Sequence, residues 1–570
     1  MSRLVIENGI VYDPKNGVDG EEKDIFIEDG KVVESFSGND ADTIDASGKV
    51  VMPGGVDVHS HIAGSKVNAG RKMRPEEGTT YYSKKDYPRS GAGRSVISTF
   101  STGYLYGKMG WTTVIDPAMP PLEARHTHEE LADIPIIDKA AYPLVGNNWM
   151  VMEFLRKGDT KGLAAFIAWL LRSTKGYALK LVNPGGTESW GWGKNVGGLD
   201  DPVAYFDVTP GEIIRGLEEV NELLGLPHSI HVHGNNLGMP GNYKTALDTI
   251  DITKGVKPGS NVRDNIIHLT HAQFNSYAGK SWREFQSGAK DVAEKVGERD
   301  DVVMDMGQVI FGNTTTMTAD GPFQFNLQKL NHLKWINSDV ELETGSGIVP
   351  FIYRKNHPVN VVQWAVGLEL ALHLNDPEKL VLTTDHPNGG PFTYYPEVIS
   401  WLTSEEARKE EMEDMHKNIE RATTLPTLDT EFDLVDITKI TRSTSAKILG
   451  LEDRGHLGPG AVGDVAVYDL NPEKVDISKD YEKVREAFRT ASYCVKDGEI
   501  VAKDGKIKKD KYGKTLWVDA KVPEDLEKEV GKEIEKKFKR YYTVNINNYP
   551  TQEHYLKNPE TISIDATGEF

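Results

Sequence analysis

The chain has 570 residues, more than one hydrophobic core usually supports, so we expect two or more structural units. Its 66 Lys and Arg residues against 86 Asp and Glu give a net charge of −20, which would repel nucleic acids and anionic lipid headgroups. No apolar stretch approaches the roughly 20 residues that span a bilayer, and the N-terminus lacks a signal-peptide pattern. We therefore expect a cytoplasmic protein with no nucleic-acid or membrane partner.

Cysteine content restricts the metal chemistry. Cys494 is the single cysteine, so the chain can form no internal disulfide and cannot supply four thiolates to an iron–sulfur cluster. Any metal must be held by His, Asp, Glu or a modified side chain, which favours zinc and other divalent ions.

The two ends of the chain share a β-rich texture. Residues 1–55 read as short strands with Asn-Gly and Asp-Gly hairpin signals, and the same pattern returns in "GDVAVYDLN", "ASYCVKDGEIVAKDGKI" and "TLWVDA". Neither end has enough strands for a stable sandwich alone. We predict one small composite β-sandwich domain built from residues 1–55 plus 431–510.

The middle of the chain, residues 56–430, alternates short apolar runs with amphipathic stretches typical of helices. This α/β pattern and length predict a (β/α)8 TIM-like barrel, in which the carboxyl ends of the strands carry the chemistry. Residues 511–570 predict a C-terminal extension, a charged helix from "KVPEDLEKEVGKEIEKKFKRYY" followed by an extended arm.

The segment "VDVHSH" places His59 and His61 two residues apart, so on a strand both imidazoles project from one face and can reach a single ion. The spacing alone is a weak signal, because His126 and His128 repeat it in "EARHTHEE". That second pair lies among charged residues and predicts a solvated loop or helix start.

Lysine and histidine end three further apolar runs. In "GYALKLVNPGG", Lys180 lies between apolar residues, where an unpaired ammonium is costly. The residue is therefore a neutral base, a salt-bridge partner or a carbamate formed with CO2. "HSIHVHGNN" offers His231 and His233 on one face, and "IIHLTHAQ" offers His268 and His271. The last two are three residues apart, so they cannot both point the same way on a regular strand.

Asp385 ends the run "VLTTDHPNGG", where a carboxylate could act as a metal ligand and general base. The adjacent His386 would point away, so we expect a structural role for it. Each residue alone has an ordinary structural explanation, but the order His-x-His, Lys, His, His, Asp at successive strand ends is hard to obtain by chance.

These residues and their order resemble the amidohydrolase superfamily. "VMPGGVDVHSH" is similar to the strand-one signature of the cyclic amidohydrolases, and "SAKILGLEDRGHLGPGAVGDVAVYDLNP" is similar to the segment that closes their composite β domain. The resemblance implies that His59 and His61 bind one zinc ion, that Lys180 is an N6-carboxylysine bridging two ions, that His233 and His268 bind the second, and that Asp385 completes the site. His231 and His271 remain alternative ligands or outer-shell residues.

Four further segments resemble the A subunits of archaeal formylmethanofuran dehydrogenases, over almost the full chain; bacterial formyltransferase/hydrolase subunits share much of the pattern. They are "HVHGNNLGMPGNY", "HLTHAQFNSYAGKSW", "GQVIFGNTTTMTADGP" and "TTDHPNGGPFTYYP". The resemblance implies partner subunits, one with tungsten- or molybdenum-pterin and others with iron–sulfur clusters, which reduce CO2 to formate in a ferredoxin-dependent reaction. The A-type chain, without pterin or cluster, condenses formate with the amine of methanofuran at a binuclear zinc site, or hydrolyses formylmethanofuran, in the first step of methanogenesis from CO2.

Two other functions stay open. One is a free-standing cyclic amidohydrolase of the hydantoinase or dihydroorotase kind, and the other is a catalytically silent scaffold protein of such a complex. Arg71, Lys72 and Arg74, after the first barrel strand, could meet an acidic substrate tail, but a solvated loop is the favoured interpretation.

Overall fold

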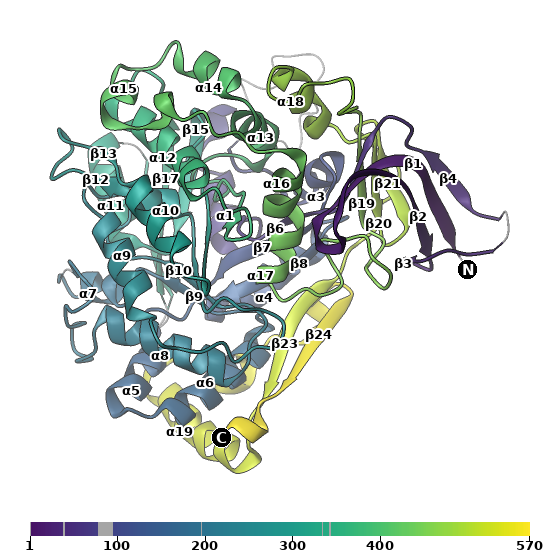
Figure 1. Cartoon of the computed structure of the whole chain (residues 1–570). Coiled ribbons are helices and arrows are strands. Elements are labelled where there is room, and N and C mark those ends of the chain that lie inside the picture. The colour runs from purple at the N-terminus through teal and green to yellow at the C-terminus, as the bar shows by residue number, and fades with distance from the viewer. Residues whose placement is uncertain (1, 38–39, 78–94, 195, 333, 341–343) are drawn as a thin grey trace.

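Eight parallel strands line a barrel in the middle of the chain (Figure 1). This computed structural model describes every residue except 1, 38–39, 78–94, 195, 333 and 341–343. The barrel strands are β6 (Gly55–Asp57), β7 (Trp111–Met119), β8 (Asp138–Pro143), β9 (Lys180–Val182), β10 (Ile230–His233), β11 (Ile267–Leu269), β14 (Val302–Asp305) and β18 (Leu380–Val381).

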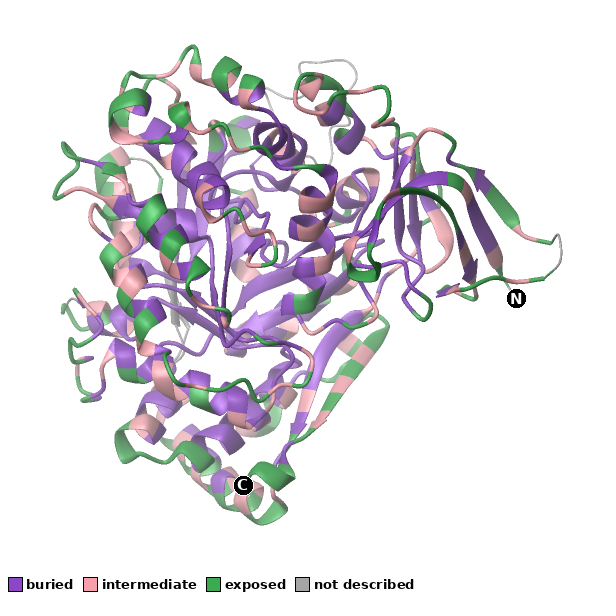
Figure 2. Ribbon diagram, viewed as in Figure 1, coloured by how far each residue is buried: buried purple, intermediate pink, exposed green. Residues whose placement is uncertain are grey.

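The barrel closes through two single β-bridges. Strands β6, β7 and β8 form one parallel sheet, and β9, β10, β11, β14 and β18 form another. A bridge between Leu144 and Lys180 joins β8 to β9, and a bridge between Ser60 and His386 joins the chain after β6 to the chain after β18. The barrel strands are buried along their length, as expected of parallel strands covered by helices (Figure 2). The predicted (β/α)8 architecture is therefore confirmed.

Helices cover the outside of the barrel (Figure 1). Their ends follow local signals: at α8, Thr209 and Glu212 form a reciprocal capping box and Pro210 occupies the first turn. No helix in the described ranges has both the length and the apolar composition needed to cross a bilayer. The helices are α1 (Ser65–Arg71), α3 (Thr99–Lys108), α4 (Ala124–Asp133), α5 (Trp149–Lys157), α6 (Thr160–Thr174), α7 (Gly186–Gly191), α8 (Pro210–Leu223), α9 (Tyr243–Ile252), α10 (Ala289–Gly297), α11 (Gly321–Asn331), α12 (Pro358–Leu374), α13 (Tyr395–Thr403), α14 (Glu405–Met412), α15 (Asn418–Ala422), α16 (Leu434–Thr438), α17 (Thr444–Ile448) and α18 (Tyr481–Arg489).

Short strands in the loops above the barrel add two small sheets. The pair β12 and β13 forms a hairpin, and β15, β17 and β16 form an antiparallel sheet. Their bounds are β12 (Tyr277–Ala278), β13 (Gln286–Ser287), β15 (Gly312–Thr318), β16 (Ile336–Val340) and β17 (Thr344–Tyr353).

Strands from both ends of the chain form one nine-stranded sheet beside the barrel, with its own apolar core. Asp29-Gly30, Asp497-Gly498 and Asp504-Gly505 join its hairpins, with positive φ at both residues of each pair, as two-residue turns require. Strands from both chain ends thus share one sheet, as the predicted composite domain requires, and the bounds of that domain, residues 1–55 plus 431–510, stay a prediction. Its strands are β1 (Arg3–Asp13), β2 (Val18–Glu28), β3 (Lys31–Val33), β4 (Asp42–Asp45), β5 (Val50–Pro53), β19 (Val465–Tyr468), β20 (Tyr493–Lys496), β21 (Glu499–Lys503) and β22 (Lys506–Ile507).

The last sixty or so residues extend the barrel rather than the β unit. The segment "TLWVDA", grouped in the sequence with the β unit, lies in β23 (Thr515–Lys521), which pairs in parallel with β8 and with β24 (Pro559–Asp565). The predicted charged helix is α19 (Glu524–Tyr541), and it is not fully exposed. Its apolar residues Val530, Ile534 and Phe538, spaced four apart, are buried on the side that contacts α6.

A buried charge network joins the β unit, the barrel and the C-terminal extension. The Lys496 ammonium on β20 lies 2.9 Å from Asp138 on β8 and 2.8 Å from Asp464. Arg454 lies 2.9 Å from the same Asp138 and 3.5 Å from Glu560 on β24. Since Lys496 and Asp138 are fully buried, each charge depends on its partner.

We expect Lys496→Met to lower the free energy of unfolding by about 3–5 kcal/mol, because buried Asp464 loses its ammonium partner and Asp138 keeps only Arg454. Urea denaturation followed by circular dichroism measures this. The control is Lys31→Ala, which breaks an exposed 2.9 Å pair with Asp453 and should cost under about 1 kcal/mol. Equal losses in the two variants would contradict the role of burial.

A second prediction concerns Glu218 on α8, which is buried and whose carboxyl oxygens have no hydrogen-bond partner among the described residues. Burial raises its pKa from 4.5 to about 9, so the folded protein keeps a proton that the unfolded chain releases. Stability should therefore fall as pH rises above about 5, by up to about 1.4 kcal/mol per pH unit. Glu218→Gln should remove this slope, whereas Glu219→Gln, on the exposed face, should leave it unchanged. Melting temperatures between about pH 6 and 8 measure both.

Candidate metal centre

The predicted ligands converge inside the barrel at the carboxyl ends of its strands. His231 on β10 is the register partner of Lys180 on β9 and of His268 on β11, so these three side chains lie at one level of the barrel wall. His59 and His61 follow β6, and Asp385 follows β18, the strands on the other side of the barrel. All of these residues are buried.

One group of ligand atoms is formed by His59, His61 and Asp385. The Nε2 atom of His59 lies 3.0 Å from Asp385 Oδ1, and Nε2 of His61 lies 3.3 Å from the same oxygen. The backbone of Asp385 is left-handed, with φ of 49°, which aspartate tolerates better than most residues and which turns its carboxylate inward. Asn388 Nδ2 donates a 2.8 Å hydrogen bond to the same Oδ1.

Two further groups share His231. Its Nε2 atom lies 2.8 Å from Nδ1 of His59, and both belong to a group with Asp305. Its Nδ1 atom lies 3.1 Å from Nε2 of His228, and these two form a group with His268. His268 also reaches Asp305, with 2.9 Å between Nε2 and Oδ2. The cluster is thus continuous across the barrel.

His233 and His271 lie beside these groups. Their rings are 4.8 Å apart, edge to face, and Nε2 of His233 lies 3.1 Å from Asp320 Oδ2. The sequence argument that His268 and His271 cannot both face the site fails because β11 ends at Leu269 and the backbone at His271 is left-handed, with φ of 36°. Both histidines therefore meet the cluster, and the choice within each pair stays a prediction.

Lys180 faces the carboxylates without bonding to them. Its Nζ atom is buried and has no hydrogen-bond partner among the described residues. Burial lowers its pKa to about 7, although Asp385 and Asp305 act in the opposite direction. The salt-bridge explanation is therefore not favoured, and much of this lysine is a neutral amine near neutral pH.

Sequence reasoning missed several buried ionisable groups at the site. Asp305 ends the apolar run "DVVMD", the same signal that identified Asp385. Asp57 accepts hydrogen bonds from the hydroxyls of Tyr106 and Tyr395, and burial raises its pKa to about 6. Lys66 on α1 has a buried ammonium without a hydrogen-bond partner in the described ranges; burial lowers its pKa to about 8, against attraction from Asp116, Glu123 and Asp385.

Other candidate residues have structural roles. His128 is buried near the start of α4, where Nε2 hydrogen-bonds the carbonyl oxygen of Thr174, so the helix start is the alternative that the structure shows and the solvated loop is wrong at that position. Arg71 pairs with Glu130 and Arg74 donates to the carbonyl oxygen of Thr314, whereas Lys72 is exposed. The His386 ring lies edge to face with Phe392, with 4.9 Å between ring centroids, and its carbonyl oxygen accepts from the His61 amide at 2.7 Å; its structural role stays a prediction.

The donor set fits divalent metal ions. Nδ1 of His61, Nδ1 of His268 and Nδ1 of His271 are buried without a hydrogen-bond partner in the described ranges, which proteins rarely tolerate. Burial lowers the pKa of His59 and His61 well below 6.5, so both are neutral, the form that binds zinc. Imidazoles with carboxylates are ligands that zinc accepts.

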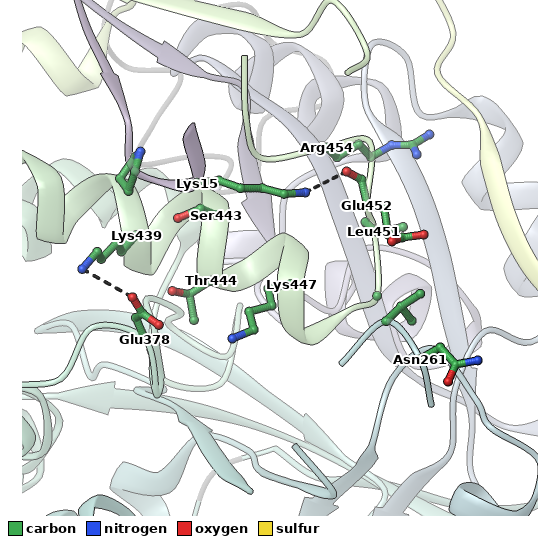
Figure 3. A pocket seen from close by; sticks show the side chains of 13 residues that line it. Lys15, Asn261, Glu378, Lys439, Ser443, Thr444, Lys447, Leu451, Glu452 and Arg454 are labelled. Atoms are coloured by element: carbon green, nitrogen blue, oxygen red, sulfur yellow. Dashed lines mark hydrogen bonds and ion pairs between the residues drawn. The ribbon is translucent and has the colours of Figure 1, made fainter. Parts of the chain in front are cut away.

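A separate cavity of about 340 Å3 lies away from this cluster (Figure 3). It is lined by residues that precede β11 and β18, such as Asn261 and Glu378, so it lies at the amino end of the barrel strands. Lys439 pairs with Glu378 across it, and Lys15 donates to the Glu452 carbonyl oxygen. None of the predicted ligands lines it, and barrel chemistry belongs at the opposite end.

A (β/α)8 barrel with buried histidines, a lysine and an aspartate at the carboxyl ends of its strands is typical of metal-dependent amidohydrolases, and comparison with known proteins agrees. A model of the amidohydrolase family matches residues 42–502, so the chain belongs to the amidohydrolase family. Within it, the chain is 57% identical over 567 residues to Protein FwdA of Methanocaldococcus jannaschii, with 99% of each sequence covered. It thus falls in the group of formylmethanofuran dehydrogenase A subunits, as the resemblance predicts.

Two further relatives come from Methylorubrum extorquens. The Fhc A subunit of the formyltransferase/hydrolase complex is 36% identical over 540 residues, with 94% of each sequence covered. The crystal structure of the formyltransferase/hydrolase complex FhcABCD in complex with methylofuran contains a chain that matches with a TM-score of 0.88 and 33% identity, covering 98% of this chain and 99% of that one.

We expect His59→Asn to lower the metal content of the purified protein more than His61→Asn, because His59 belongs to two ligand groups and His61 to one. Elemental analysis of protein prepared with zinc and bicarbonate measures this. The control is His373→Asn, a histidine on α12 that hydrogen-bonds Thr424 and should leave the metal content unchanged. Equal metal loss in the His59 and His61 variants would contradict a shared ligand.

Proposed function

We propose that the chain condenses formate with the amine of methanofuran to give formylmethanofuran, and catalyses the reverse hydrolysis, at a binuclear zinc site. The observation that carries the proposal is the buried cluster of His59, His61, His231, His268 and Asp385 beside Lys180, whose amine has no hydrogen-bond partner among the described residues. The relatives support it, since one is the A subunit of a formyltransferase/hydrolase complex and that complex is solved with methylofuran.

His59 and His61 would hold one ion, His233 and His268 the other, with Asp385 completing the site and His231 and His271 as alternatives. Lys180 would be carboxylated and bridge the pair. Its buried, largely neutral amine supports this assignment, because only a neutral amine adds to CO2 and the carbamate would place a negative charge between two cations. The zinc ions would polarise the formate carboxylate and stabilise the charge that develops on the tetrahedral intermediate.

The side chains would handle binding and protons. Formate and the ammonium form of the amine would give the amide and water: the nitrogen bonds to the formate carbon and gives up two protons, and Asp385 passes them in turn to the formate oxygen that leaves as water. Asn388 orients the Asp385 carboxylate through its 2.8 Å hydrogen bond. Lys66, buried and attracted to Asp385, supplies a positive charge that favours an anionic substrate such as formate.

The redox chemistry that supplies formate would reside on other subunits. Cys494 is buried on β20, and burial raises the pKa of its thiol. The thiol is therefore protonated, and the residue contributes to packing and not to redox chemistry. We therefore propose partners that carry the tungsten- or molybdenum-pterin and the iron–sulfur clusters, so that the whole complex is a ferredoxin-dependent oxidoreductase acting in the first step of methanogenesis from CO2, in the cytoplasm.

We expect Asp385→Asn to keep most of the bound metal and to lower kcat for deformylation of formylmethanofuran by about 10²–10⁴-fold, because the amide cannot carry the proton. Formate release by the purified protein measures kcat, and elemental analysis measures the metal. Thr384→Ser, a conservative change at the preceding residue, should retain activity.

Normal turnover in Asp385→Asn would contradict the proton-transfer role. Wild-type activity on hydantoin or dihydroorotate rings, with none on N-formyl amines, would identify a cyclic amidohydrolase instead. Bound metal without activity on either substrate class would indicate a silent scaffold.

A further inference from the structure

Three buried imidazoles form a hydrogen-bonded chain that links α17 to the candidate metal centre. The chain begins at the carbonyl oxygen of Ile448, the last residue of α17, which lies 2.6 Å from Nδ1 of His228. Nε2 of His228 lies 3.1 Å from Nδ1 of His231, and Nε2 of His231 lies 2.8 Å from Nδ1 of His59. His228 precedes β10 and has no part in the chemistry proposed above.

The direction of these hydrogen bonds is fixed at the Ile448 end. A carbonyl oxygen can only accept, so Nδ1 of His228 carries a proton. Burial lowers the pKa of His228 and of His231 well below 6.5, so each ring is neutral and has a single N–H group. Nε2 of His228 is therefore an acceptor, and Nδ1 of His231 is the donor. Nε2 of His231 is then left as an acceptor that faces His59.

This order determines which nitrogen of His59 is available to a metal ion. Because His231 accepts, Nδ1 of His59 is a donor, and the Thr270 hydroxyl, 2.5 Å from the same nitrogen, can accept from it as well. The lone pair of the neutral His59 ring then lies on Nε2, which is 3.0 Å from Asp385 Oδ1. A metal ion binds the unprotonated nitrogen of an imidazole, so this tautomer presents the ligand atom toward Asp385.

Packing holds the His228 ring in this orientation. The Tyr142 ring on β8 is stacked on it, with 5.4 Å between the ring centroids and 23° between the ring planes. Both residues are fully buried. A rotated His228 ring would break its hydrogen bonds to Ile448 and His231, and buried polar groups that lose a partner are costly.

We propose that His228 is a positioning residue for the metal centre, which transmits the hydrogen-bond direction set by Ile448 through His231 to His59 and so presents Nε2 of His59 to the ion. The inference rests on the metal site of the proposed function and adds to it the residue that prepares one ligand before the ion binds. Both nitrogens of His231 are engaged in the chain, so this residue takes the outer-shell role among its two alternatives.

The first measurement is the tautomer of each ring in the metal-free full chain. Long-range proton–nitrogen correlation spectra of protein with isotope-labelled histidine distinguish Nδ1–H from Nε2–H rings, and single substitutions assign the signals. We expect the Nδ1–H form for His228, His231 and His59. A wild-type His59 ring in the Nε2–H form would overturn the proposal. The wild-type spectrum still decides if a substitution at His228 prevents folding.

The second measurement is the Kd for zinc, obtained by competition with a chelator. In His228→Asn the amide nitrogen can take the place of Nδ1 and donate to Ile448, but the side chain is too short to accept from His231. We expect this variant to raise Kd by about 10–100-fold, as the loss of an outer-shell partner does, and to change the His59 tautomer. His228→Gln is one methylene longer, so its oxygen can accept from His231, and it should bind zinc nearly as tightly as the wild type.

The matched control is His128→Asn. It removes another fully buried imidazole that hydrogen-bonds a backbone carbonyl oxygen, that of Thr174, and that has no contact with the chain of three rings. It should leave the zinc Kd and the His59 tautomer unchanged.

Equal Kd values for zinc in His228→Asn, His228→Gln and the wild type would overturn the positioning role, and so would an equal loss of affinity in the His128 control. Loss of one whole zinc ion per chain from both His228 variants at saturating zinc would also overturn it, because His228 would then be a ligand. If the wild-type chain shows the expected tautomers and zinc affinities but releases no formate from formylmethanofuran, the proposed function fails and the positioning role stands.

Discussion

Barrel closure is the constraint on which the rest of this structure depends. The two halves of the barrel meet at single bridges, Leu144 with Lys180 and Ser60 with His386, and each bridge involves a predicted ligand or its direct neighbour. Ser60 lies between His59 and His61, and His386 follows Asp385. The backbone contacts that close the barrel therefore also set the spacing of the ligand cluster. A shift of the backbone at either bridge would separate ligands that belong to different barrel strands.

The cluster is costly to bury, and metal binding offsets that cost. Several imidazole nitrogens and the Lys180 amine are buried and have no hydrogen-bond partner among the described residues. Burial lowers the pKa of His59, His61 and Lys180, which favours their neutral forms, and raises the pKa of Asp385 well above its ordinary value. Divalent ions would offset this cost of burial, because they stabilise the charged carboxylates and accept the lone pairs of the neutral imidazoles. The same arrangement suits a reaction in which charge develops at one carbon.

Stability and chemistry occupy opposite ends of the barrel. The network of Asp138, Lys496 and Arg454 ties the composite sheet and the C-terminal strands to the barrel wall, away from the ligand cluster. At the other end, the segments that follow β6 and β18 carry His59, His61, Lys66 and Asp385. This division is the general one for (β/α)8 barrels, in which loops after the strands vary with substrate while the far end holds the fold.

Local sequence signals determined the elements and the ligand types: Asp-Gly pairs placed the hairpins, and apolar runs ending in His, Lys and Asp located His59, His61, Lys180 and Asp385. Only the tertiary structure decided which side chains meet. It brought Asp305 and Lys66 to the cluster and gave His128 a structural role. His268 and His271 both reach the cluster because the strand ends between them and the backbone turns left-handed. Periodicity describes regular strands alone, and the decisive contacts are made where the strands end.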